Sequence, residues 1–326
     1  MKLDLTNDQI HTSMIVEASA GTGKTYAVAA LVARELAVRA DLRIGHILIT
    51  TFTRNAAMEL RHRIRKRIIS TASSLRSSSV DRADSVTSFL FDTNETERME
   101  RALRLERALV EFDTATISTI HGVCSRVLRT AGIDIETVVD AEETDRIVNE
   151  VVNDAIVAAA ASGQRWDEST LRSLLTILLG DPFIEPWFDE QEIVDQAVID
   201  CLWSLTEILT QCVHRVHNAM ASTPDSNDLL RRAYELVADP RSAVVKRLQK
   251  RFLLAIVDEA QDTDRLQWEF FTRLFPGTDD RSLVSVGDPK QAIYSFRGAD
   301  VQAYVNFMRK RYHFHFLQAT DIFYEN

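Results

Sequence analysis

The feature that most constrains this chain is the segment IVEASAGTGKTYAVAAL, residues 15–31. A short apolar run leads into a glycine-containing turn, which is followed by a sequence with helical periodicity. Gly21 and Gly23 carry no side chain, so the backbone of the turn can approach a ligand closely. Consecutive backbone N–H groups and the positive end of the following helix then favour a bound phosphate. The segment predicts a strand, a phosphate-binding loop and a helix.

The residues of this loop suit a nucleoside triphosphate with its Mg²⁺ ion. Lys24 would reach the β- and γ-phosphates, and the Thr25 hydroxyl would ligate Mg²⁺. The loop departs from the generic pattern at Ala18, where a glycine is usual. A chance glycine turn is the alternative, but the strand before it and the helix after it argue against chance. We expect the phosphates to contact the run Ala18, Ser19, Ala20, Gly21, Thr22, Gly23, Lys24 and Thr25.

An acidic segment, IVDEAQD at residues 256–262, follows the apolar run LLAIV at 253–257. An aspartate at the end of a buried strand can hold Mg²⁺ through its water shell, and a neighbouring glutamate can accept a proton from an attacking water. Acidic pairs at strand ends are common by themselves. Together with the phosphate loop on a parallel sheet, this pair predicts the second half of a nucleotide site.

A third segment, GDPKQAIYSFRGAD at residues 287–300, follows another apolar run. The amide of Gln291 could sense a γ-phosphate by hydrogen bonding. Tyr294 and Phe296 could stack on unpaired bases, at about 1–3 kcal/mol per base. Taken alone, the two aromatic residues are better explained as core residues.

Strand-like and helix-like segments alternate at both ends of the chain and predict a parallel sheet covered by helices. The expected strands are 14–17, 46–51, 253–257 and 283–286, and the first two helices are 24–39 and 55–69. A serine-rich break covers residues 70–79. From about residue 97 to 251 the apolar residues recur at three- and four-residue spacing, as in 142–161 and 190–209, which predicts a large helical insertion.

Composition excludes several classes of protein. The sequence has no apolar run of 18 residues and no signal-peptide core, so we expect a cytoplasmic protein without membrane contact. Cys124, Cys201 and Cys212 lie far apart, which supports neither a disulfide framework nor a metal cluster. His214 and His217 have no third ligand nearby in the sequence, so metal binding is not expected there.

Charge gives a weaker indication about nucleic acid. The formal net charge of −10 argues against a protein that coats nucleic acid, although a groove can be basic on an acidic body. The strongest basic cluster, RHRIRKR at residues 61–67, lies on an expected helix. A ligand-contacting face and a solvated helix face explain it equally well.

Six segments in order resemble the N-terminal part of the UvrD/Rep-type superfamily 1 DNA helicases, and most of all their RecB-like branch. The resemblance covers residues 9 to 310 and rests on these segments: IVEASAGTGKT, TTFTRNAAMELRHRI, DTATISTIHGVCSRVLR, NDLLRRAYEL, VDEAQDTD and VGDPKQAIYSFRGAD. It implies an α/β, RecA-like P-loop NTPase sheet with an all-helical insertion. The implied boundaries are 1–75 with 228–326 for the discontinuous ATP-binding domain and 76–227 for the helical insertion.

The resemblance also implies roles for individual residues. In the ATP site, Gln9 would read the adenine edge, Lys24 and Thr25 would bind phosphate and metal, Asp258 would ligate Mg²⁺, Glu259 would be the catalytic base, and Gln291 would link the γ-phosphate to movement. The residues implied to approach single-stranded DNA are Phe52, Arg54, Thr119, His121, Tyr294, Phe296 and Arg297. For His121, a buried histidine at a helix end is the alternative. Helix 61–67 is expected to be structural, because the family uses the loop of this motif.

The resemblance ends after residue 310. Family members continue into a second RecA-like domain whose arginines reach the γ-phosphate, and the corresponding segments are not seen in RKRYHFHFLQATDIFYEN, residues 309–326. We therefore expect an ATP-dependent 3′–5′ helicase or translocase acting on single-stranded DNA or DNA ends, truncated after its first RecA-like domain and weak by itself. A separate chain supplying the second domain, or a RecC- or RecD-like protein, would be the partner. The alternative is an ATP-gated DNA- or partner-binding module without productive turnover.

Overall fold

The computed structural model describes residues 5–6, 13–17, 23–77, 79–135, 138–186, 188, 195–276, 281–288 and 316–318. The chain forms two compact units, one made of Met1–Val123 with Val237–Asn326 and the other of Cys124–Leu236. Within the described residues the first unit contains a sheet and helices, and the second contains helices alone. We call them the sheet unit and the helical unit.

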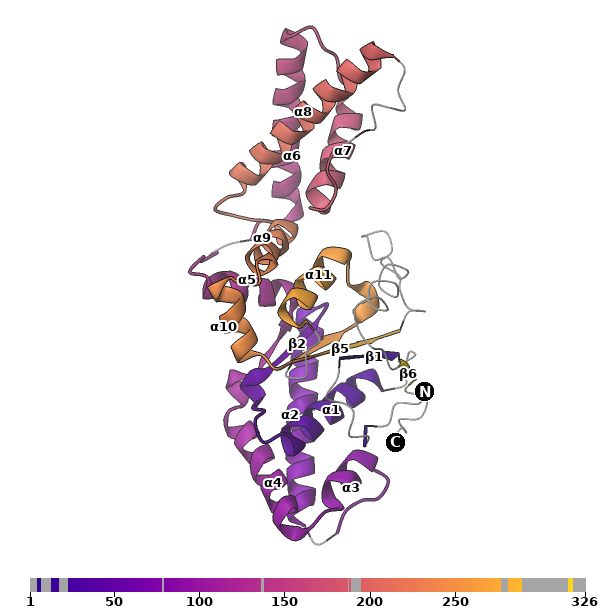
Figure 1. The fold of residues 1–326 in the computed structure, drawn as a ribbon, viewed down its shortest axis with the longest axis vertical. Helices are drawn as coiled ribbons and strands as arrows, with labels where there is room; N and C mark the ends of the chain where they lie inside the picture. The colour runs from indigo at the N-terminus through magenta and orange to yellow at the C-terminus, as the bar shows by residue number, and fades with distance from the viewer. Residues whose placement is uncertain are drawn as a thin grey trace. The chain divides into compact units, whose positions relative to one another are not determined.

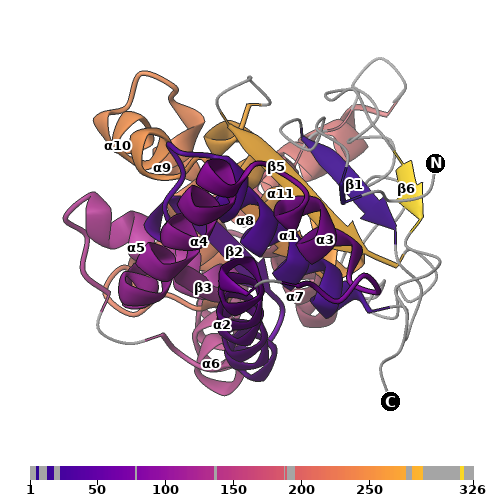
Figure 2. The ribbon, with the colours of Figure 1, turned by 90° about the horizontal axis from the view of Figure 1, so that it is seen from below.

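The sheet unit is built on a parallel sheet. Among the described residues its strand order is β3-β2-β4-β5-β1-β6, and each neighbouring pair is parallel. Figure 2 shows β1 and β6 together at one end of this sheet. The strands are β1 (Met14–Glu17), β2 (Ile47–Thr51), β3 (Thr116–Thr119), β4 (Leu254–Asp258), β5 (Ser282–Gly287) and β6 (Phe316–Gln318). The α/β class expected from the sequence is confirmed.

Strands β2, β4 and β5 are buried along their whole length. This explains their continuous apolar sequences, because a parallel strand covered on both faces does not alternate between apolar and polar residues. In register, Ile49 lies opposite Ile256, and Ile256 lies opposite Val284. All strands end on the same edge, so the residues that follow β4 and β5 meet there.

Helices cover both faces of the sheet. In Figure 1, α1 and α2 lie below the strands with α3 and α4, and α11 lies above them. The bounds are α1 (Lys24–Val38), α2 (Arg54–Arg76), α3 (Ser85–Phe91), α4 (Glu95–Val110), α10 (Ala243–Arg251) and α11 (Arg265–Leu274). Among the described residues, short 3-10 turns lie between the helices and the strands: η2 (Ile44–His46), η3 (Phe112–Thr114) and η5 (Ala260–Asp262).

Two expectations about local structure were wrong. The serine-rich stretch does not break the chain at residue 70, because α2 continues to Arg76 and buries Thr71, Ala72 and Leu75. Residues 116–119, expected to be helical, form strand β3 beside β2. Both differences arise because burial against a sheet or core overrides local composition.

The units also differ from the boundaries stated from the sequence. Residues 76–123 were assigned to the helical insertion, but the side chains of α3 and α4 belong to the core of the sheet unit. This core joins Val86, Leu90 and Leu105 to residues of α1 and α2. The helical unit begins at Cys124 and extends to Leu236.

The helical unit has a core of its own. Helices α6 (Ala141–Ala161), α7 (Glu168–Gly180) and α8 (Gln196–Ala219) pack against one another, while α5 (Ile120–Thr130) and α9 (Ser226–Ala238) border the unit. The buried residues include Val152, Leu171, Leu175, Leu209, Cys212 and Val216. Asp140, Asp167 and Asp195 cap the three packed helices by accepting backbone N–H groups. No described helix has the length and hydropathy that a membrane span requires.

Candidate active site at the carboxyl edge of the sheet

The candidate site lies where β4 ends and α1 begins. After Asp258 the chain turns sharply into η5, and Glu259 takes the left-handed conformation with φ 54° and ψ 44°. It is the one non-glycine residue with positive φ in the described part of the chain. Such a conformation is unfavourable for a residue with a side chain and recurs at functional sites. The turn places the Glu259 carboxylate beside the start of α1.

Lys24 and Glu259 form an ion pair across this edge. Lys24 Nζ lies 2.7 Å from Glu259 Oε2, although the two residues are 235 positions apart. Lys24 is the first residue of α1, and the preceding Gly23 takes φ 85°, where glycine has no steric penalty. The described end of the glycine loop and the acidic segment therefore converge on one place.

Gln261 connects this ion pair to the end of β5. Its side-chain Nε2 donates to Glu259 Oε2 at 2.8 Å, and its Oε1 accepts the backbone N–H of Asp288 at 2.9 Å. Gly287 permits this approach, since a Cβ there would lie 2.6 Å from Gln261 Oε1 and 3.2 Å from the Ala260 nitrogen. Sequence reasoning did not single out Gln261. The available signal was its position within VDEAQD, between two acidic residues.

Two carboxyl groups at this edge, those of Asp258 and Asp262, have raised pKa values. Burial, with the nearby charge of Glu259, raises the pKa of Asp258 to about 6, against a usual 3.8. The same two causes raise the pKa of Asp262. One oxygen of each carboxyl, Asp258 Oδ1 and Asp262 Oδ1, is buried without a hydrogen-bond partner in the described structure. Such acceptors are suited to a cation or its water shell.

A small cavity of about 20 Å³ lies beside these carboxylates. This is room for about one water molecule. Its lining joins the carboxyl ends of β2 and β4 and includes Thr50, Thr51, Phe52, Asp258, Glu259 and Asp262. The hydroxyls of Thr50 and Thr51 have no hydrogen-bond partner in the described structure. The cavity places the ring of Phe52 and the acidic residues on the walls of one space.

Four of the residues expected to approach DNA are described. Phe52 and Arg54 lie exposed at the junction of β2 and α2, and Phe52 is 39% exposed. Thr119 ends β3, and its hydroxyl accepts the backbone N–H of Gly122 at 3.3 Å, so it caps α5. His121 is half-buried in the first turn of α5.

The remaining expected residues lie outside the described residues. They are Gln9, Ala18, Ser19, Ala20, Gly21 and Thr22 before α1, and Gln291, Tyr294, Phe296 and Arg297 after β5. The site therefore rests on Gly23, Lys24, Thr25, Asp258 and Glu259. Thr25 is half-buried in the first turn of α1, next to Lys24.

Two arginines of the basic cluster 61–67 make structural contacts. Arg61 donates to the Ala115 carbonyl at 3.1 Å and lies over the ring of Phe112. Arg67 donates to Asp84 at 2.7 Å and lies 5.0 Å from the centre of the Tyr26 ring. These contacts account for both side chains within the fold.

A parallel sheet whose carboxyl edge brings together a lysine, a glutamate and a buried aspartate is the arrangement expected of a P-loop NTPase fold. The match to the family of the UvrD/REP helicase N-terminal domain covers residues 5–312. The chain belongs to this family.

Individual relatives agree with the family. The chain is 34% identical over 300 residues to the RecBCD enzyme subunit RecB of Mycobacterium tuberculosis, covering 90% of this chain and 27% of that protein. It is 32% identical to RecB of Mycolicibacterium smegmatis, with the same two coverages. It is 24% identical over 301 residues to DNA helicase II of Haemophilus influenzae, covering 90% of this chain and 34% of the relative. The chain thus spans about a quarter to a third of these relatives.

Proposed function

We propose that this chain is the ATP-binding and ATP-hydrolysing part of a DNA helicase or translocase that moves 3′ to 5′ on single-stranded DNA. The observation that carries the proposal is the contact of Lys24 Nζ with Glu259 Oε2 at 2.7 Å, beside the buried Asp258. A phosphate-binding lysine and a catalytic carboxylate have to meet at one triphosphate. The family membership supports the same activity.

The described residues fit ATP with Mg²⁺. Asp258 offers a buried oxygen that has no partner in the described structure, Thr25 offers a hydroxyl, and Gly23 leaves the backbone open at the start of α1. Asp258 and Thr25 would hold the metal, and the loop from Ala18 to Lys24 would hold the phosphates. When bound, the metal supplies charge neutralisation at the phosphate oxygens. Gln9 would face the adenine.

The Lys24–Glu259 pair would give the Lys24 side chain two positions, one without nucleotide and one with it. Without nucleotide, the ammonium of Lys24 neutralises the Glu259 carboxylate. With a triphosphate bound, Lys24 would turn to the phosphate oxygens, which leaves the Glu259 carboxylate able to accept a proton from water. Gln261 would hold the Glu259 carboxylate in place with or without nucleotide, because the Gln261 side-chain oxygen is itself fixed by the backbone N–H of Asp288. Gln291 would report the γ-phosphate to the rest of the motor.

DNA would contact the carboxyl edge beyond β2. Phe52 and Arg54 present an aromatic ring and a guanidinium there, a combination that binds unpaired bases and phosphates. Thr119, His121, Tyr294, Phe296 and Arg297 would complete the path. Since RecB is by name a subunit of the RecBCD enzyme, we propose that this chain works with a further chain or domain.

Nucleotide binding by the chain itself tests the proposal. We expect a fluorescent ATP analogue to bind in the presence of Mg²⁺, with EDTA weakening the binding, and the weak ATP hydrolysis of the chain by itself to rise when oligo-dT is added. Absence of Mg²⁺-dependent binding would contradict the nucleotide site. ATP binding and hydrolysis that do not change when oligo-dT is added would contradict the proposed DNA motor but not the ATP site.

A further inference from the structure

The two units differ strongly in charge. Residues 124–236 contain 21 acidic and 8 basic side chains, all arginine, for a formal charge of −13. The rest of the chain contains 27 acidic and 30 basic side chains, for a formal charge of +3. The acidity of the whole chain therefore belongs to the helical unit. Such a field repels phosphate backbones and attracts cationic partners.

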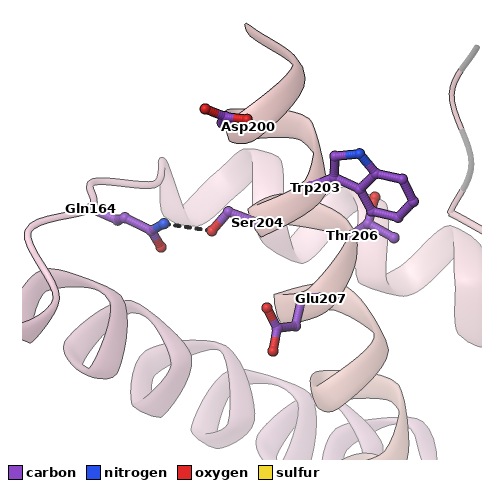
Figure 3. Close-up of a pocket in the computed structure, with 6 residues that line it drawn as sticks. All are labelled: Gln164, Asp200, Trp203, Ser204, Thr206 and Glu207. Atoms are coloured by element: carbon purple, nitrogen blue, oxygen red, sulfur yellow. Dashed lines mark hydrogen bonds between the residues drawn. The ribbon is translucent and has the colours of Figure 1, made fainter. Parts of the chain in front are cut away.

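An open hollow of about 600 Å³ lies on this acidic unit, along one stripe of α8. Its lining residues are Gln164, Asp200, Trp203, Ser204, Thr206 and Glu207 (Figure 3). Asp200, Trp203, Ser204 and Glu207 follow the spacing of a single helix face. Gln164, from the turn after α6, donates to Ser204 at 2.6 Å and so fixes one wall.

Trp203 lines the same hollow, and Figure 3 shows its indole projecting from α8 away from the Asp200 and Glu207 carboxylates. Trp203 is 54% exposed, and its ring meets Phe188 edge-on at 5.2 Å between centres. An exposed indole and exposed carboxylates on one helix each attract ammonium and guanidinium groups, because the ring face and the carboxylates are both negative.

Asp200 and Glu207 differ from other acidic residues of the unit in their partners. Asp154 pairs with Arg215, Glu143 with Arg146, and Asp228 with Arg232. Within the described residues the two carboxylates of the hollow form no ion pair and accept only glutamine amides, at 3.0 Å from Gln196 and 3.3 Å from Gln211. The negative charges of Asp200 and Glu207 are therefore not neutralised by a described residue, and they can pair with a cation of another molecule.

We propose that this hollow is a docking site for an arginine- or lysine-rich segment of a partner protein. Asp200 and Glu207 are about 10 Å apart along the helix, which matches about three residues of an extended chain. An extended segment with basic residues two or three positions apart places one cation on each carboxylate and a third group over Trp203.

Fluorescence anisotropy with a labelled peptide of alternating arginine and glycine tests the site on the full chain. The wild-type chain binds this peptide, more weakly as salt is added, and does not bind a peptide of alternating glutamate and glycine. The double variant Asp200→Asn with Glu207→Gln, and separately Trp203→Leu, each weaken binding by about fivefold or more.

The matched control is Glu142→Gln with Glu185→Gln, which removes the same charge from two exposed residues of the unit outside the hollow. It leaves the affinity within about twofold. Circular dichroism and thermal unfolding verify that every variant is folded. Equal weakening by the control pair, no effect of Trp203→Leu, or no binding by the wild type would each overturn the proposal. Lys24→Ala leaves peptide binding unchanged, so the result is independent of the ATP site.

Discussion

Glu259 is held in the candidate site by both its backbone conformation and its side-chain contacts. Its backbone is left-handed, and its Oε2 accepts both Lys24 and Gln261. A residue held in an unfavourable backbone conformation persists only where the surrounding structure fixes it. Here the buried strand β4 on one side and η5 on the other do so. The carboxylate is thus oriented before any ligand binds.

Lys24 should carry much of the nucleotide affinity. Lys24→Ala removes the ammonium that pairs with Glu259 at the acidic edge, and we expect the affinity for a fluorescent ATP analogue with Mg²⁺ to fall by about tenfold or more. Lys66→Ala, an exposed lysine of α2, is the matched control and should bind like the wild type. Wild-type affinity in Lys24→Ala would contradict the assignment.

The buried Asp258 predicts a pH dependence of stability. Its pKa is about 6 in the folded chain against a usual 3.8, so the folded state binds this proton more tightly than the unfolded state. Protonated Asp258 therefore adds to the free energy of unfolding below pH 4. This contribution, about 3 kcal/mol at most, is lost as the pH rises to about 6.

Asp258→Asn should therefore flatten the stability profile between pH 4 and 6 and stabilise the nucleotide-free chain at pH 8. Urea unfolding in EDTA across this range measures the effect. Part of the pH dependence of the unfolding free energy will remain in this variant, because burial and the charge of Glu259 also raise the pKa of Asp262. A variant with the full wild-type slope would show that Asp258 is not the group responsible.

At the scale of elements, the contact between η5 and the end of β5 should depend on Gly287. Gly287→Ala places a Cβ 2.6 Å from Gln261 Oε1 and 3.1 Å from the Gln261 backbone nitrogen, and the backbone cannot yield freely. We expect a loss of about 1–3 kcal/mol in the free energy of unfolding and a larger drop in hydrolysis than in nucleotide affinity. Gly180→Ala meets open space and should leave both unchanged.

Helix α2 is tied to its neighbours by Arg67, which contacts Asp84 before α3 and the ring of Tyr26 in α1. Arg67→Ala leaves the half-buried Asp84 carboxylate without its cation, and we expect a loss of about 2–3 kcal/mol in the free energy of unfolding. Arg63, on the same helix, pairs with Glu59 in solvent, so Arg63→Ala should cost less than about 0.5 kcal/mol. Equal effects in denaturant unfolding would contradict a structural role for Arg67.

At the scale of the molecule, the two units have separate cores, one around α1, α2 and α4 and one around α6, α7 and α8. A ligand that binds one folded unit stabilises that unit, by about 2.7 kcal/mol at 100 times its dissociation constant. We expect ATP analogues with Mg²⁺ to slow amide hydrogen exchange in α1 and η5 and to leave α6–α8 unaffected. Equal protection of both units would contradict independent cores.

The sequence by itself determined the class of fold and supplied the residue types of the candidate site, because both depend on local sequence patterns. Continuous apolar runs that end in charged residues identified β1, β4 and β5, and GKT with VDEAQD supplied the lysine and the carboxylates. Hydrophobic spacing likewise identified the amphipathic helices of the helical unit.

Only the tertiary structure decided the detailed contacts between distant groups. Local composition placed a break at residue 70 and helix at 116–119, whereas burial against the core extended α2 to Arg76 and recruited β3 into the sheet. The role of Gln261 was also hidden, since it depends on the end of β5 approaching within a hydrogen bond. The two motifs predicted that Lys24 and the acidic segment share one site, but the direct contact of Lys24 with Glu259, 235 positions away, depends on how the chain packs.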